Sequence, residues 1–178
     1  MSIESLRGLV SPPDQPVEVP DDATWMLVER ELGVALPRDF KDCLRIYGTG
    51  SFGGFLWVFN PASANPHLHL KTQIQRSLDG LRTLKAEDPE ELPYALFPEP
   101  EGLLPWGITD NGDGLYWHTA GEPEQWTVVV NAGRDPECEE FPLGATGFLA
   151  AILRQSIKSD VLPSDFPPRS PRFQPVDH

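Results

Sequence analysis

The sequence predicts an α+β fold in which a mostly antiparallel, twisted sheet is flanked by helices. Amphipathic segments with the spacing of helices fill most of the first half of the chain, and short β-rich runs fill most of the second half. Helices and strands grouped in this way, rather than alternating, are typical of α+β domains. A length of 178 residues fits one domain of ordinary size, which can bury a core without disulfides.

Two helices open the predicted core. Asp21 or Asp22 can cap the first helix, and Gly33 supplies its C-terminal stop. Pro37 suits the first turn of the second helix, whose apolar stripe ends before Gly48. Both segments are therefore predicted to be short amphipathic helices.

A buried strand and a longer helix follow. Residues 55–59 are apolar and aromatic over a run too short for a helix, and Asn60 with Pro61 ends it, so we predict a buried strand. Apolar residues recur at spacings of three and four over residues 66–85, which predicts an amphipathic helix. Gly80 weakens this helix by about 1 kcal/mol without breaking it.

Three β-rich runs predict an antiparallel meander. They cover residues 103–109, 115–119 and 126–130. The dipeptide Asn111-Gly112 between the first two runs favours a tight hairpin turn. The three runs are therefore predicted to be neighbouring strands.

A fourth strand over residues 139–142 and a final amphipathic helix over residues 146–157 complete the predicted core. Many of the 20 prolines crowd the two ends of the chain, where they disfavour both helix and sheet. We therefore predict a single domain over residues 21–158, an N-terminal proline-rich arm over 1–20 and a proline-rich tail over 159–178.

The charge of the chain is strongly asymmetric. Fourteen Lys and Arg residues against 27 Asp and Glu residues give a net charge of -13, which argues against nucleic acid and anionic membranes as partners. Between Ala86 and Glu140 the sequence has fourteen acidic residues and one basic residue, Arg134. Such a stretch is either a solvated face or a surface that meets a basic protein. The candidate partner-binding residues are Asp110, Asp113, Glu122, Glu124, Glu137, Glu139 and Glu140.

Residues 48–53 match the letters of the phosphate-binding pattern GxGxxG in the wrong context. A predicted helix precedes these glycines and a strand follows, whereas dinucleotide binding needs a strand and then a helix. The glycines are expected to carry the chain from helix to strand through positive φ. Ser51 nearly completes a nucleophile elbow, but Thr49 replaces its first glycine, so Ser51 is predicted to be a loop serine.

The residues that could act in catalysis or metal binding do not form a recognisable active-site or metal-site pattern. His67 and His69 are two residues apart and have no second ligand pair, so no metal site is predicted. Cys43 is predicted to be a core residue, and Cys138 forms no CxxC pair with it. His118 could act as a general base, but no nucleophile can be named beside it. We expect no cofactor, no catalysis and, without a signal peptide or a long apolar run, a cytoplasmic protein.

Several segments resemble the SUKH superfamily, which includes the yeast cell-wall-assembly regulators and many bacterial immunity proteins. The family pattern is a Leu-Pro-x-Asp/Glu-Tyr/Phe helix that ends in a Tyr-Asn-Gly-Gly-like loop, and this chain lacks the usual asparagine of that loop. The resemblance covers about residues 21–158. The segments that carry it are Leu36-Pro37-Arg38-Asp39-Phe40, Tyr47-Gly48-Thr49-Gly50, Leu104-Pro105-Trp106-Gly107-Ile108-Thr109, Asn111-Gly112-Asp113-Gly114-Leu115-Tyr116-Trp117, Trp126-Thr127-Val128-Val129-Val130 and Phe148-Leu149-Ala150-Ala151-Ile152-Leu153.

The resemblance implies a SUKH-like α+β fold without catalytic residues. Bacterial members of the family are similar to immunity proteins that bind and neutralise a cognate toxin, often a nuclease. A basic nuclease fits the acidic stretch of this chain, so the expected partner is a cognate protein toxin or another basic protein. An intracellular regulatory or scaffold module, with the proline-rich ends docking other proteins, is the alternative. A hydrolase that uses His118 is a third hypothesis.

Overall fold

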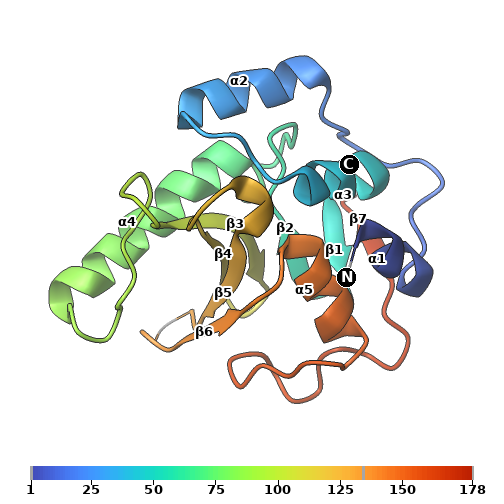
Figure 1. Cartoon of the computed structure of the whole chain (residues 1–178). Coiled ribbons are helices and arrows are strands. Elements are labelled where there is room, and N and C mark those ends of the chain that lie inside the picture. The colour runs from blue at the N-terminus through green and yellow to red at the C-terminus, as the bar shows by residue number, and fades with distance from the viewer. Residues whose placement is uncertain (1, 134, 178) are drawn as a thin grey trace.

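A seven-stranded antiparallel sheet forms the centre of the molecule, and helices pack on both of its faces (Figure 1). This computed structural model describes residues 2–133 and 135–177. The predicted α+β fold with a mostly antiparallel sheet is confirmed. The strand order is β6-β5-β4-β3-β2-β1-β7. The strands are β1 (Gly50–Phe52), β2 (Leu56–Val58), β3 (Leu103–Thr109), β4 (Gly114–His118), β5 (Thr127–Asn131), β6 (Cys138–Phe141) and β7 (Phe173–Pro175), and the helices are α1 (Ile3–Leu9), α2 (Asp22–Leu32), α3 (Arg38–Tyr47), α4 (Leu70–Glu87) and α5 (Ala145–Leu153).

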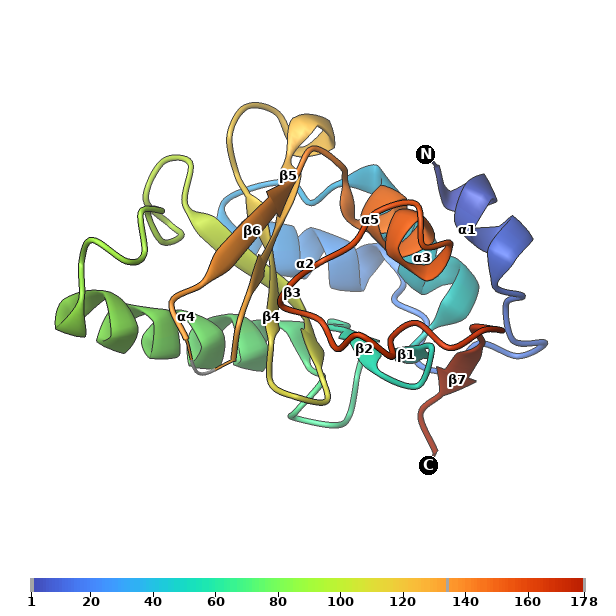
Figure 2. The ribbon, with the colours of Figure 1, turned by 90° about the horizontal axis from the view of Figure 1, so that it is seen from below.

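The helices divide between the two faces of the sheet (Figures 1 and 2). On one face, Phe40 of α3 meets Trp117 of β4 edge to face at 4.8 Å between ring centroids. Phe148 of α5 packs against Trp106 of β3 on the same face. On the other face, α4 crosses the sheet and contacts β3. Because each face is covered by amphipathic helices, the large apolar side chains of β3, β4 and β5 are buried.

The first two predicted helices, α2 and α3, begin and end close to the predicted residues. Asp21 caps α2 by accepting a hydrogen bond from the Thr24 amide at 2.8 Å, and Gly33 ends it with a φ of 74°. Gly48 follows α3 with a φ of 69°. The long helix α4 begins at Leu70 rather than near residue 66, because a preceding turn ends at His69, which accepts from the Thr72 amide.

The predicted meander is confirmed. Strand β3 has the predicted bounds, and Gly112 takes a φ of 87° in the hairpin turn to β4. Strands β4, β5 and β6 each differ from their predicted bounds by about one residue. Helix α5 is shorter than predicted, because Gln155 takes a φ of 62° and ends the helical backbone before Ile157.

The predicted proline-rich arms are not free of the core. Leu6 of α1 and Val10 are buried in the hydrophobic core, and Leu162 of the predicted tail joins them. Strand β7 pairs with β1 and adds the seventh strand to the sheet. Both chain ends lie on the side of the molecule away from β6 (Figure 2). The expected boundaries at residues 21 and 158 are therefore corrected, because buried apolar contacts outweigh the local effect of proline.

Residues 47–50 hold both chain ends, and we call them the 47–50 junction. The Tyr47 hydroxyl donates a buried hydrogen bond to the Val10 carbonyl at 2.6 Å. The Thr49 amide donates to the Val17 carbonyl at 3.0 Å, and the Thr49 carbonyl accepts from the Val176 amide at 3.0 Å. The Tyr47 ring also contacts Phe173 of β7. The N-terminal and C-terminal segments are thus fixed to one short stretch of chain.

The glycines of this junction are required by the geometry. A Cβ atom added at Gly48 would overlap the Val17 backbone oxygen, and the positive φ there disfavours any other residue. The predicted role in turning the chain from helix to strand through positive φ is confirmed at Gly48, whereas Gly50 has no positive φ and Gly53 takes one only after β1. Ser51, however, lies in β1 and is fully buried, so the prediction of a loop serine is wrong. The strand pairs with β2 on one side and with β7, far along the chain, on the other.

We predict that Gly48→Ala lowers the free energy of unfolding by more than about 2 kcal/mol, as measured by urea denaturation. The control is Gly33→Ala, because Gly33 also has a positive φ, 74°, and no heavy atom within 4 Å of an added Cβ; its ψ of 16° is left-handed helical, whereas Gly48 has a ψ of -153°. That control should cost only about 1 kcal/mol, the penalty for positive φ alone. Equal losses in the two variants would contradict the proposed packing of Val17 on Gly48.

Candidate functional site

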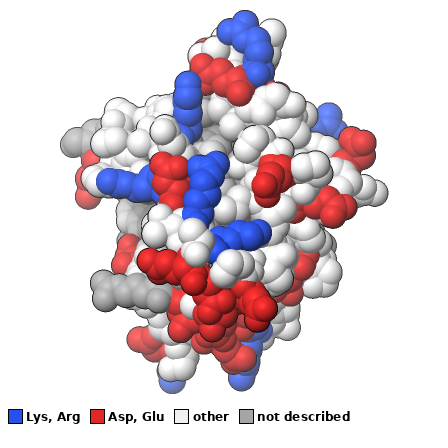
Figure 3. Space-filling view, turned by 90° about the vertical axis from the view of Figure 1, so that its left-hand side faces the viewer, with Lys and Arg blue, Asp and Glu red and all other residues white. Residues whose placement is uncertain are grey.

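Of the fourteen acidic residues between 86 and 140, Glu87 ends α4 and five lie between α4 and β3, whereas the other eight lie on β6 or in the connections between the strands from β3 to β6. Most of these side chains are exposed; Asp113 is buried and Glu139 is half-buried. On the face that carries the end of α4, acidic side chains gather below a band of Lys and Arg side chains (Figure 3). The charge asymmetry in the sequence therefore corresponds to one half of the molecule, although the acids do not form one flat face.

One end of the strands carries Glu122 and Glu124, which lie in the connection from β4 to β5 and are exposed. The loop that enters β3 lies beside this connection, because the Thr119 hydroxyl donates to the Gly102 carbonyl at 2.7 Å. That loop carries further exposed carboxylates. We call this region the acidic end; the loop contributes Asp88, Glu90, Glu91, Glu99 and Glu101.

The opposite end of the strands carries three more predicted residues. Asp110 and Glu137 are exposed there, whereas Asp113 is only 6% exposed. The Asp113 carboxylate accepts hydrogen bonds from the Thr109 hydroxyl at 2.7 Å and the Gly133 amide at 3.1 Å. Asp113 therefore holds two turns together and is not part of an exposed binding surface. Strands of five residues separate this end from the acidic end by roughly 15 Å.

The last two predicted residues lie on β6, the edge strand. Because successive side chains of a strand point to opposite faces, Glu139 and Glu140 do not act together. Glu139 accepts hydrogen bonds from the Ser159 hydroxyl and, at 2.7 Å, from the Asp160 amide. Glu139 thus fastens the C-terminal segment to the edge of the sheet.

Glu140 is the centre of a polar cluster. Its carboxylate accepts from the Thr127 hydroxyl at 2.6 Å and the Tyr94 hydroxyl at 3.1 Å, and it lies 2.9 Å from His118 Nδ1. Burial would raise the pKa of Glu140, but the hydrogen bonds from Thr127, His118 and Tyr94 outweigh it and lower the pKa below its usual value. The cluster joins β4, β5 and β6 to the loop that follows α4.

The Glu140 cluster fits a structural role better than a catalytic one. The Thr127 and Tyr94 hydroxyls both donate to Glu140, so neither donates to His118. Burial, with a smaller effect of Glu140, raises the pKa of Tyr94 to about 12, which keeps this hydroxyl protonated. His118 is therefore oriented by a carboxylate, as in a catalytic dyad, but the described residues place no activated nucleophile beside it.

The other side chains that could take part in catalysis or metal binding either make structural contacts or lie apart from one another. His69 caps α4, and exposed His67 lies 3.3 Å from an Arg76 guanidinium nitrogen. Burial raises the pKa of the Cys43 thiol, and Cys138 is also a free thiol. Within residues 2–133 and 135–177 no three His, Cys, Asp or Glu side chains are grouped to hold a metal ion. In the same part of the chain no helix is both long and apolar enough to cross a membrane.

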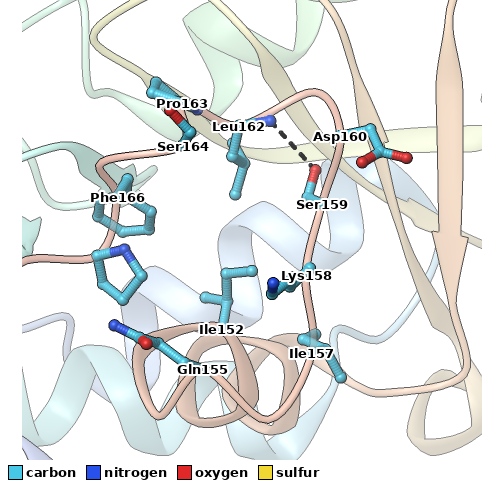
Figure 4. A pocket seen from close by; sticks show the side chains of 11 residues that line it. Ile152, Gln155, Ile157, Lys158, Ser159, Asp160, Leu162, Pro163, Ser164 and Phe166 are labelled. Carbon is cyan, nitrogen blue, oxygen red and sulfur yellow. Dashed lines mark hydrogen bonds between the residues drawn. The ribbon is translucent and has the colours of Figure 1, made fainter.

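A cavity of about 460 Å³ lies between α5 and the C-terminal segment (Figure 4). Ile152 of α5 and Leu162 point into it from opposite sides, and Phe166 lines a third side (Figure 4). The Ser159 hydroxyl accepts from the Leu162 amide at 3.2 Å and so shapes the turn above the cavity. Polar and apolar side chains share its walls, and the polar ones include Lys158, Asp160 and Ser164. The Ser159 hydroxyl is used in the turn.

Comparison with known proteins gives one family match and one structural likeness. The sequence profile of SUKH_6, described as SMI1-KNR4 cell-wall, matches residues 22–149. No curated protein sequence matches the chain. A crystal structure of a protein from Pseudomonas syringae pv. tomato superposes with a TM-score of 0.49 at 21% sequence identity, covering 82% of this chain and 91% of that chain.

Glu140→Gln should remove up to about 1 kcal/mol of stability at neutral pH, a modest value because the side chain is partly exposed. A carboxylate with a lowered pKa stabilises the fold above its unfolded pKa near 4.3, and this contribution is lost as the pH falls through the lower folded pKa. Urea denaturation of the wild type and the variant should therefore give a difference that shrinks below about pH 4. A difference that is constant from pH 7 to pH 3 would contradict the role of the Glu140 charge.

Proposed function

The chain belongs to the SUKH family of SMI1-KNR4 cell-wall proteins, and from this premise we propose that it is a non-enzymatic immunity protein. Family membership supports a protein-binding role of the toxin-immunity or SMI1-KNR4 kind. The finer proposal is that it binds and neutralises a cognate protein toxin through the exposed acidic side chains of the β3 to β6 half. A basic nuclease is the class of toxin that such a surface suits best.

The distribution of charge is the observation that carries this proposal. Exposed carboxylates surround the β3 to β6 half at both ends of its strands, and the stretch from residue 86 to residue 140 has one basic residue. Nucleases need a basic surface to bind a polyanionic substrate. An acidic inhibitor can occupy that surface and is drawn to it by long-range attraction, which raises the association rate.

The arrangement at His118 supports a role without catalysis. The Glu140 carboxylate is shared among three partners from three different segments, which fixes the edge of the sheet. Loss of that carboxylate would loosen β6. A protein that must present a constant surface to its partner benefits from such a fixed edge.

The alternative is an intracellular regulatory or scaffold module of the SMI1-KNR4 kind, whose terminal segments dock other proteins. Helix α1 and strand β7 are packed into the domain, and Pro20 is buried. Deleting residues 163–178 would remove a strand of the sheet, so this deletion cannot separate the two hypotheses. A toxicity assay separates them: the open reading frame next to this gene should be lethal when expressed alone and harmless when expressed with this protein.

We predict that the association rate constant with the partner falls at least tenfold between low and physiological salt, as measured by stopped-flow fluorescence. Glu124→Lys with Glu137→Lys should slow association further, because both residues are exposed and neither side chain has a hydrogen bond among the described residues. Asp14→Lys with Asp177→Lys is the matched control, since it makes the same change in net charge in the terminal segments, outside the β3 to β6 half.

Slower association in the first double variant alone would support a local acidic surface. An equal effect of both double variants would show that only the total charge matters. An association rate that does not change with salt would remove the electrostatic basis of the proposal.

A further inference from the structure

Helix α2 presents an uncovered apolar face. The described residues whose large apolar side chains are strongly exposed are Val19, Met26 and Leu27, at 41%, 71% and 47%. All three lie on α2 or just before it. The opposite side of the helix is fixed to the core, because the Trp25 ring meets Phe40 edge to face at 6.1 Å. Apolar side chains that gather on one exposed face, rather than scatter over the surface, mark a contact site.

The exposed face of α2 has a form that packs against another helix. Asp22, Met26 and Arg30 follow one another at intervals of four residues and so form one ridge along the helix. Ala23 and Leu27 form the next ridge, and all five side chains are exposed. In the commonest type of helix packing, ridges of this spacing interdigitate with the same ridges of a second helix. Helix α2 lies at the outer edge of the molecule (Figure 1), so a second helix can reach this face.

The charges on α2 are complementary to those of a second copy of the helix. Glu29 and Glu31 are ion-paired within the molecule, at 2.7 and 2.9 Å, with lysines of α3 and α4. The other two charged residues of the helix, Asp22 and Arg30, are exposed and have no ion-pair partner among the described residues. They stand on opposite sides of Met26 along the ridge. In an antiparallel pair related by a two-fold axis at Met26, Asp22 of each copy meets Arg30 of the other, so two ion pairs form.

We propose that α2 is the interface of a homodimer, in which the α2 helices of two copies pack antiparallel about a two-fold axis at Met26. The side chains of Met26 and Leu27 from both copies fill the centre, and the pairs between Asp22 and Arg30 flank it. A two-fold interface uses the same surface on both copies, so that surface must be complementary to itself, as the α2 face is in its charges. The inference goes beyond the proposed function and does not depend on it.

The distribution of charge favours a second copy over other occupants of this face. Outside residues 86–140 the sequence has 13 acidic and 13 basic residues, so the part of the chain that contains α2 has no net charge with which to repel its copy. A basic protein would find no excess of negative charge on the helix, because lysines neutralise two of its carboxylates. An anionic membrane would need several Lys or Arg residues around the apolar ones, and Arg30 is the one basic residue of α2. The repulsion between two whole chains of net charge -13 acts over longer distances and is screened by salt.

Sedimentation equilibrium of the purified chain tests the dimer. One helix per copy buries less than a standard interface of about 1,600 Å², so we expect a weak dimer with a dissociation constant on the order of 10–100 µM. At physiological salt the average mass should rise from 19.8 kDa towards twice that value as the protein concentration rises from about 5 to about 500 µM. Met26→Lys should raise the dissociation constant at least about tenfold, because it places two like charges against each other at the axis. Ala86→Lys makes the same charge change at an exposed position near the end of α4, and this matched control should leave the constant unchanged.

An exchange of charges tests the antiparallel register. In Asp22→Arg two copies would place cations against Arg30, and in Arg30→Asp they would place anions against Asp22, so each variant alone should dimerise about tenfold more weakly. In an equimolar mixture of the two variants, every pair joins opposite charges, and dimerisation should return to about the wild-type strength. The matched control is the pair Asp165→Arg and Arg169→Asp, two exposed residues of the C-terminal segment, which should have no effect alone or mixed.

Each outcome supports or overturns the dimer. A chain that stays monomeric at about 500 µM, or a dimer that Met26→Lys leaves intact, would overturn it. A mixture of Asp22→Arg and Arg30→Asp that associates no more tightly than either variant alone would also overturn it. So would control variants that act as strongly as those on α2, because total charge and not the α2 face would then govern association. Far-UV circular dichroism should show the same fold in every variant, since all the substituted side chains are exposed.

Discussion

The hydrogen bond from the Tyr47 hydroxyl to the Val10 carbonyl, buried where α3 turns into β1, is the contact on which the arrangement of the chain ends depends. The next three residues of the 47–50 junction pair with Val17 and with the C-terminal segment. The junction therefore places β7 so that it pairs with the outer edge of β1. Asp39, in the first turn of α3, makes a second long-range contact: its carboxylate accepts from the Thr146 amide at 3.0 Å and caps α5.

Local sequence signals predicted those helices and strands whose bounds depend on neighbouring residues in the sequence. The bounds of β3 and the stop of α2 at Gly33 follow from β-rich composition and from a glycine that can take positive φ. The terminal elements α1 and β7 were missed, because proline content argued for arms and no local pattern reveals that Val10 meets Tyr47, 37 residues away. The start of α4 was misplaced for a related reason, since the turn before His69 is stabilised by hydrogen bonds that the helical period does not show.

The acidic surface was predicted in part. Composition located the charge within residues 86–140, and the structure assigns that stretch to one half of the sheet and its connections. Sequence could not separate exposed carboxylates such as Glu124 from those already used inside the fold, such as Asp113 and Glu139, because that depends on partners far along the chain.

The protein combines fixed chain ends with a half of the sheet that is rich in exposed carboxylates, and we propose that this half meets a basic partner. Hydrogen–deuterium exchange of the complex with the partner purified from the native cell tests this division most directly. The account predicts that binding slows exchange in the connections at both ends of β3 to β6 and leaves α1, β1 and β7 unchanged. Protection confined to α1, β1 and β7 would contradict it, because the partner would then bind the side of the molecule away from the acidic residues.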